Sequence, residues 1–206
     1  MKGSKFKKGD TLIEVILAMS IFAALMVGAL YLMNSGLARA QTTLQITMAR
    51  NLMDSQAELL RFSNAAFIAN YPNSIPANSA ASRWQSYISE TRIASDLSDC
   101  SDKSHSFIIN PVNGEKQTDN SLKSADTFPM IVYDLPPNVN NNVNNNDSNH
   151  IMPKNNYNEA RGIWIQAVQG ASSKFYDFHI RACWSPAGSS HPITLGTIVR
   201  LYVPTN

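Results

Sequence analysis

A long uncharged run lies near the N-terminus of the chain. From Val15 to Ala38 the sequence has no charged residue and no proline, and it is rich in leucine, isoleucine, valine, methionine, phenylalanine and alanine. About 20 such residues are enough for a helix to cross the hydrocarbon core of a bilayer. The run therefore predicts a membrane-spanning helix over about residues 11–38.

The charges around this run indicate its orientation. Four lysines precede it and Arg39 follows it. The positive-inside rule places the short basic leader in the cytoplasm and the remainder of the chain outside. A cleavable secretory signal has an apolar core of only about 7–15 residues, so this run is too long for one. A plain signal anchor is the remaining simple alternative.

One acidic residue, Glu14, lies just inside the apolar segment. A charged side chain at the centre of a membrane helix costs about 2.5–3.5 kcal/mol on insertion scales, and an acid near one end costs less. A buried carboxylate is tolerated when a buried cation neutralises it. Glu14 is therefore expected to have a cationic partner.

The sequence Gly9-Asp10-Thr11-Leu12-Ile13-Glu14-Val15 resembles the class III signal of type IV prepilins and pseudopilins. The resemblance covers about the first 40 residues. It implies that prepilin peptidase removes residues 1–9 by cutting between Gly9 and Asp10, and that the new amino group of Asp10 is methylated. It also implies that Glu14 pairs with the N-terminal amine of a neighbouring subunit during filament assembly.

The chain departs from this family pattern at two places. The first residue of the mature chain is usually phenylalanine or another apolar residue, whereas here it is Asp10. Major pilins often carry a proline partway along the N-terminal helix, whereas this chain has none before Pro72.

The helical pattern continues beyond the apolar run, which predicts one long helix over residues 10–64. Its second half is expected to pack on a sheet through a stripe of apolar residues, namely Leu44, Ala49, Met48, Leu52, Leu59 and Leu60. Polar residues, Gln56 among them, are assigned to the other faces. Residues 65–206 are predicted to form a single domain outside the cytoplasm.

This domain is predicted to be α+β. A short helix is expected at 83–97 with Trp84, Ile88 and Ile93 facing inward, and strands are expected at 105–110, 128–135, 162–169, 174–184 and 195–203. Alternation in the strand at 174–184 places Tyr176, Phe178, Ile180, Ala182 and Trp184 on the buried face and Asp177, His179, Arg181 and Cys183 toward solvent. The asparagine-rich segment 138–149 has too few apolar residues to order itself and is predicted to be a flexible loop.

The two cysteines, Cys100 and Cys183, both fall outside the cytoplasm in this topology, where disulfides persist. Pilins often join their C-terminal region by a disulfide, so the resemblance supports a bond between them. Two free thiols are one alternative. A zinc site that adds His105 or His179 is another, although the spacings fit no standard zinc pattern.

Catalytic and nucleic-acid-binding motifs are weak in this sequence. The four histidines are scattered, and there is no glycine-rich phosphate loop or serine-centred elbow. A Cys183–His179 pair on an exposed strand face is more simply incidental, so the chain is expected to be neither an enzyme nor a binder of a cofactor or small-molecule substrate. Four of the 17 basic residues lie in the leader, which leaves 13 against 15 acidic residues and no basic block for nucleic acid.

Three functions remain open at this point. The chain is a minor pilin of a type IV pilus or related filament, a pseudopilin of a secretion or DNA-uptake system, or an anchored binding domain that never polymerises. The first two imply prepilin peptidase, other pilin subunits, an inner-membrane assembly platform and membrane lipid as partners. They place the protein first in the cytoplasmic membrane and then in an extracellular or envelope filament.

Overall fold

The computed structural model describes residues 10–89, 91, 100, 103–118, 122–125, 127–132, 159–170, 174–186 and 191–204. The chain divides into two compact units, Met1–Leu44 and Gln45–Asn206. The predicted leader at 1–9 and the asparagine-rich segment at 138–149 lie outside the described residues.

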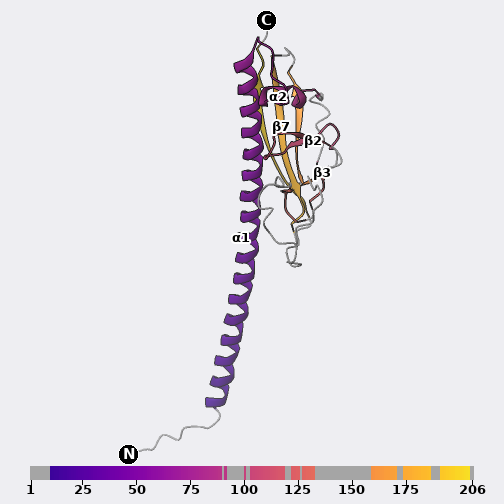
Figure 1. Cartoon of the computed structure of the whole chain (residues 1–206). Helices are drawn as coiled ribbons and strands as arrows, with labels where there is room; N and C mark the ends of the chain where they lie inside the picture. The colour runs from indigo at the N-terminus through magenta and orange to yellow at the C-terminus, as the bar shows by residue number, and fades with distance from the viewer. Residues whose placement is uncertain are drawn as a thin grey trace, which may run out of the picture. The chain divides into compact units, whose positions relative to one another are not determined.

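Helix α1 extends from Asp10 to Asn70 and contains 61 residues, which belong partly to each unit (Figure 1). It ends at Asn70 rather than at the predicted residue 64. Asn64 was expected to mark the end of the helix, but this residue lies six positions before the end. Its side chain donates a hydrogen bond to the carbonyl oxygen of Tyr202 at 3.0 Å. The helix ends just before Tyr71 and Pro72, because a residue that precedes proline disfavours helical geometry.

The buried stripe of α1 agrees with the prediction in part, since Ala49 and Leu60 are buried and Leu52 and Leu59 pack against the core. Leu44 and Met48 are 55% and 45% exposed, so they do not belong to the core. The buried positions of α1 are Ala49, Met53, Gln56, Ala57, Leu60, Ser63, Asn64 and Phe67. They follow the same helical period on a neighbouring face, where the small side chains of Ala49 and Ala57 are completely or almost completely buried.

Helix α2 extends from Ala80 to Tyr87 and begins three residues before the predicted position. Ser79 caps it by accepting a hydrogen bond from the backbone N–H of Ser82 at 3.2 Å. Trp84 is fully buried, as predicted, and its ring lies 5.4 Å from that of Phe178. Residues 90 and 92–99 of the predicted helix lie outside the described part of the chain.

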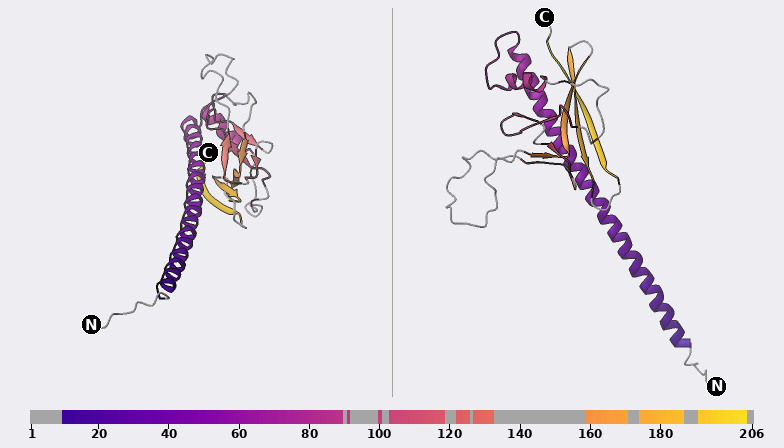
Figure 2. Two further views of the ribbon diagram at one scale, coloured as in Figure 1. Left: turned by 90° about the horizontal axis from the view of Figure 1, so that it is seen from below. Right: turned by 90° about the vertical axis from the view of Figure 1, so that its right-hand side faces the viewer.

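The main sheet has five strands in the order β2-β1-β6-β7-β8, and every neighbouring pair is antiparallel. Its strands are β1 Phe107–Ile109, β2 Lys116–Thr118, β6 Ile163–Gln169, β7 Phe175–Trp184 and β8 Ile193–Tyr202. In Figure 2 the second half of α1, in purple, lies beside the long orange and yellow strands. The predicted α+β architecture is therefore confirmed.

A second, smaller sheet has the order β3-β5-β4, with β3 at Leu122–Lys123, β4 at Met130–Val132 and β5 at Glu159–Arg161. Gly162 separates β5 from β6 and has a φ of 64°. A Cβ atom at this position would lie 2.4 Å from the carbonyl oxygen of Cys183, which leaves room only for glycine. The chain can therefore pass from one sheet into the other at this residue.

Side chains alternate between the two faces in both long strands, and in β7 they follow the prediction with one exception. On β7, Phe178, Ile180, Ala182 and Trp184 are buried, and on β8 the inward positions begin at Ile193 and continue at every second residue to Leu201. Cys183, which was predicted to face solvent, is only 6% exposed. Its sulfur atom is bonded to that of Cys100.

Candidate functional site

The N-terminal half of α1 presents an apolar surface on all of its sides. All residues from 12 to 34 are exposed in the structure. The large apolar side chains among them include Leu12, Ile13, Val15, Ile16, Leu17, Phe22, Leu25, Val27 and Leu30, each at least 58% exposed. A helix that is apolar on every side requires an apolar environment, either a membrane or the interior of a larger assembly.

The length of this segment matches a bilayer. Residues 12–38 of a helix span about 40 Å at a rise of 1.5 Å per residue, whereas the hydrocarbon core is about 30 Å thick. In length and composition α1 meets the requirements for crossing a membrane. Its polar side chains are partly satisfied internally, as the Ser20 hydroxyl donates to the carbonyl oxygen of Ile16 at 2.7 Å.

Glu14 is the one charged residue between positions 12 and 38 of this helix. It is exposed, and it follows the first residue of α1, Asp10, by four positions. Of the other residues singled out at the predicted cleavage point, Gly9 lies outside the described residues. The structure therefore fixes the helical position of Glu14 relative to Asp10.

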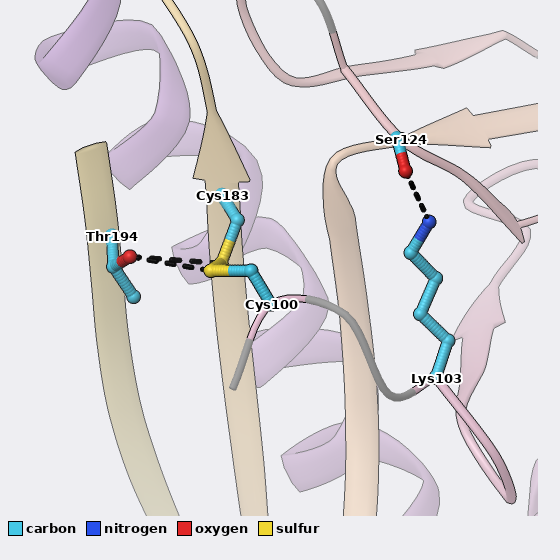
Figure 3. The surroundings of a disulfide bond; sticks show 5 residues. All are labelled: Cys100, Lys103, Ser124, Cys183 and Thr194. Atoms are coloured by element: carbon cyan, nitrogen blue, oxygen red, sulfur yellow. Dashed lines mark hydrogen bonds between the residues drawn. A yellow bond between two sulfur atoms is a disulfide. The ribbon is translucent and has the colours of Figure 1, made fainter. Parts of the chain in front are cut away.

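The second pair of predicted residues is joined directly. Cys100 and Cys183 form a disulfide with a Cα–Cα distance of 5.9 Å and a sequence separation of 83 residues (Figure 3). The Sγ atom of Cys100 also lies 3.2 Å from the hydroxyl of Thr194 on β8. This bond ties the segment before β1 to the end of β7.

The disulfide rules out the alternative assignments for these cysteines. Neither thiol is free, and Cys183 is therefore not a nucleophile beside His179. Within the described part of the chain, no group of three or more histidine, cysteine, aspartate or glutamate side chains is arranged to hold a metal ion. Burial, together with the charge of Arg181, lowers the pKa of His179, so this histidine is neutral near pH 7.

Two groups of charged side chains form ion pairs within the two sheets. Arg200 donates from Nε and from a terminal nitrogen to the two carboxylate oxygens of Asp177, both at 2.7 Å, across the β7–β8 ladder. These hydrogen bonds lower the pKa of Asp177. Glu159 on β5 accepts hydrogen bonds from Arg161 and Lys123, which lower its pKa in the same way.

A cavity of about 150 Å³ next to the disulfide was not predicted from the sequence. Lys103 and Trp164 both line it, and the Lys103 ammonium lies 5.9 Å from the centroid of the Trp164 ring. No sequence pattern links these two residues, which are 61 positions apart. They meet because β1 pairs with β6 and the segment before β1 is held by the disulfide.

Comparison with known proteins places the recognisable part of the chain at its N-terminus. The family described as the prokaryotic N-terminal methylation motif matches residues 5–30. No curated protein and no solved structure matches the chain.

The matched residues include Gly9, Asp10, Glu14 and the first half of the apolar helix. The remainder of the chain adds an antiparallel sheet of five strands that packs on the second half of α1. The chain therefore carries the class III prepilin signature of type IV pilin-like proteins, together with a pilin-like α+β architecture.

Proposed function

We propose that the protein is a minor subunit of a type IV pilus or a related filament, with a structural rather than a catalytic role. Prepilin peptidase cuts the chain between Gly9 and Asp10, and the new amino group of Asp10 is methylated. The N-terminal helix first anchors the protein in the cytoplasmic membrane. It then moves into a filament core, where it packs against the helices of other pilin subunits.

The observation that carries this proposal is a single acid, Glu14, in residues 12–34 of α1, a segment that is otherwise uncharged and exposed on every side. A helix that serves only as an anchor gains nothing from a carboxylate at this position, because burial penalises the charge. A helix that assembles beside others can neutralise Glu14 with a cation from its neighbour. Each charge then cancels much of the desolvation cost of the other.

The cation we assign to Glu14 is the N-terminal amine of an adjacent subunit. Cleavage after Gly9 creates this amine at Asp10, the first residue of α1. In the cleaved chain the amine and Glu14 are one helical turn apart, so a shift of one turn between neighbouring helices brings the amine of one opposite the acid of the other. Uncleaved chains lack this amine and are expected to remain in the membrane.

Two features favour a low-copy subunit over one that forms the bulk of a filament. Helix α1 is continuous from Asp10 to Asn70 and contains no proline. The domain that follows it has a second sheet and a long stretch between β4 and β5, which is a large addition to a simple helix-and-sheet subunit. These features support the minor-pilin assignment and also fit a pseudopilin of a secretion or DNA-uptake system.

An immunoblot in a strain that lacks prepilin peptidase tests the processing step. In that strain the protein is expected to have an apparent mass about 1 kDa higher, because the nine leader residues remain attached. Unchanged migration would contradict the proposal and leave an anchored domain that does not polymerise.

Fractionation then separates the two kinds of filament. A minor pilin is expected in purified extracellular pili. A pseudopilin is expected only in the cell envelope, and that distribution would replace the minor-pilin assignment. A variant with Gly9→Leu, in which the cleavage point is blocked while the helix is unchanged, is the matched control for both experiments.

A further inference from the structure

Strand β8 forms one edge of the main sheet, where Figure 2 shows it in yellow. It pairs with β7 through ten consecutive residues without a bulge, and none of the described strands pairs with its other side. The opposite edge of the sheet is β2, which has only three residues. β8 is therefore by far the longer of the two edges.

The pairing of β8 with β7 identifies the backbone groups that face the open edge. The N–H of Val203 donates to the carbonyl oxygen of Lys174 at 2.9 Å. In an antiparallel ladder, residues bonded to the neighbouring strand alternate with residues whose N–H and C=O groups point away from it. The odd-numbered residues of β8 therefore bond to β7. The even-numbered residues direct their backbone groups outward, and those before Tyr202 are all exposed, namely Thr194, Gly196, Ile198 and Arg200.

Helix α1 occupies only one end of this edge. The carbonyl oxygen of Tyr202 accepts a hydrogen bond from the side chain of Asn64 on α1 at 3.0 Å, which agrees with the outward direction of the even-numbered residues. Among the described residues, no hydrogen bond reaches the outward backbone groups between Thr194 and Arg200. A row of unpaired N–H and C=O groups of this kind is a template for a further strand.

The two edges of the sheet differ in their protection against such pairing. Sheets usually protect an open edge with a lysine, a proline, a bulge or a very short strand. β2 is short and carries Lys116, whereas β8 has ten residues with neither lysine nor proline. The charge of Arg200 is engaged by the carboxylate of Asp177, and Ile198 is 60% exposed. The edge of β8 is therefore both long and open.

We propose that β8 accepts an extended strand from a different pilin-like subunit of the same filament. This inference rests on the proposed function, because it takes the partner from the same assembly. The added strand lies along residues 194–200, so it is about seven residues long or longer. Its backbone groups pair with those of β8, and an apolar side chain beside Ile198 covers this exposed residue. In strand addition the backbone bonds provide affinity and the side chains provide selectivity.

The direction of β8 favours a different subunit over a second copy of this chain. The side chain of Gln45 on α1 bonds to Trp184, which pairs with Ile193 at the start of β8. Asn64 bonds to Tyr202 at the end of β8, so this part of α1 runs in the same direction as the strand. Two β8 strands pair more stably when they are antiparallel, but that arrangement would reverse one α1 relative to the other. Two copies anchored in one membrane through the N-terminal half of α1 cannot adopt it.

Photocrosslinking in cells that assemble the filament tests this proposal. A photoreactive phenylalanine analogue replaces Ile198 in the full-length chain. We expect a crosslink to a second protein that itself carries a prepilin motif, identified by mass spectrometry of the crosslinked peptides. The same analogue at Thr118, an exposed residue of β2 at the opposite edge, is expected to give a crosslink at least fivefold weaker. Equal crosslinking from both edges would overturn the proposal.

Two substitutions at Gly196 distinguish strand pairing from simple proximity. Gly196→Pro removes an N–H that faces the open edge, and proline is tolerated at edge positions of this kind. Gly196→Ala keeps the N–H, and its Cβ atom would lie 3.9 Å from the carbonyl oxygen of Ile180, which is ordinary contact. We expect the proline variant to lower the crosslink from position 198 at least tenfold and the alanine variant to change it less than twofold. Denaturation midpoints establish that both variants are folded.

Hydrogen exchange of the unmodified chain provides a measurement that needs no variant. Backbone amides in the peptide 194–200 are expected to exchange at least tenfold more slowly in filaments than in the isolated protein in detergent micelles. Unchanged exchange would overturn the proposal, as would equal crosslinking from the two folded Gly196 variants.

The identity of the crosslinked product separates the remaining outcomes. A product with the mass of two copies of this chain, or a crosslink to a protein without a prepilin motif, would overturn the assignment of the partner. The mass of the chain is measured in the same cells. A chain that still carries its leader contradicts the proposed function itself. A cleaved chain that is present in filaments without a crosslink from position 198 overturns only the strand addition.

Discussion

Gln56 on α1 and Ile109 on β1 are joined by two hydrogen bonds, both 2.9 Å long. The Gln56 amide nitrogen donates to the carbonyl oxygen of Ile109, and the amide oxygen of Gln56 accepts from its backbone N–H. Both residues are completely buried. The side chain of Gln56 therefore supplies hydrogen-bond partners for both backbone groups of Ile109.

Replacement of Gln56 by leucine is predicted to destabilise the domain. The new side chain is apolar, but it leaves the N–H and carbonyl groups of Ile109 buried without partners, which costs about 2–4 kcal/mol in unfolding free energy. Chemical denaturation monitored by tryptophan fluorescence measures the change. Gln85→Leu on the exposed face of α2 is the matched control, and an equal effect of both substitutions would contradict this role for Gln56.

Removal of the disulfide by a Cys100→Ser, Cys183→Ser double variant is predicted to lower the unfolding free energy. The bond closes a loop over 83 residues of sequence, and the loss of chain entropy in the unfolded state corresponds to at most about 4.5 kcal/mol. The same loss is expected when the unmodified protein is reduced. A reductant that destabilises the protein and the double variant equally would contradict the account.

The stabilisation of the β7–β8 pair by Asp177 and Arg200 is predicted to be lost at low pH. The hydrogen bonds from Arg200 lower the pKa of Asp177 in the folded state, so the folded carboxylate binds its proton less readily than the unfolded one. The stabilisation is therefore fully present above the unfolded pKa of about 3.9 and is lost as the pH falls through the lower folded value. Unfolding midpoints between pH 7 and pH 2 measure this effect.

Asp177→Asn provides the comparison for that measurement. The difference in stability between the unmodified protein and this variant is expected to stay constant from pH 7 to about pH 5 and then to shrink as the acid concentration rises. A difference that is the same at pH 2 and at pH 7 would show that the Asp177–Arg200 charges contribute nothing.

The Glu14→Ala variant is predicted to be processed but not assembled. The substitution lies beyond the cleaved bond and leaves the apolar helix intact, so the leader is still removed. The acid that neutralises a neighbour's amine is lost, and the amount of protein in sheared filaments is expected to fall at least tenfold. Glu58→Ala, at an exposed position near the middle of the second half of α1, is the control and is expected to assemble normally.

The alternation of a long strand could be predicted from the sequence, whereas the short strands β2, β3 and β5 were missed. The alternation in β7 runs over ten residues and gave the correct inward face except at Cys183. β3 has only two residues, and β2 and β5 have three each, so no period can be recognised in them. Their strand geometry depends on pairing partners that are distant in the sequence.

The core side of α1 was predicted only in part, because hydropathy favours large side chains. Ala49 and Leu60 are buried as predicted, whereas Leu44 and Met48, which have the stronger apolar signal, are exposed and Ala57 and Gln56 are buried instead. Alanine allows close packing, and the amide of Gln56 replaces backbone partners for β1. These roles depend on the surface opposite the helix, which the local sequence does not contain.

The two parts of the candidate site differ in the same way. The prepilin motif is local, since Gly9, Asp10 and Glu14 lie within six consecutive residues, and it could be identified from the sequence. The contact between Lys103 and Trp164 depends on sheet pairing and on the disulfide, and no local sequence pattern predicts it. The burial of Cys183 was missed for the same reason.

The intact mass of the protein isolated from the cell envelope or from filaments tests whether cleavage frees an amine for Glu14. We predict a chain that begins at Asp10, lacks residues 1–9 and carries one additional methyl group on its terminal amine. A mass that still includes the four lysines of the leader would contradict it, because no free amine would then exist at Asp10 to meet the carboxylate of Glu14.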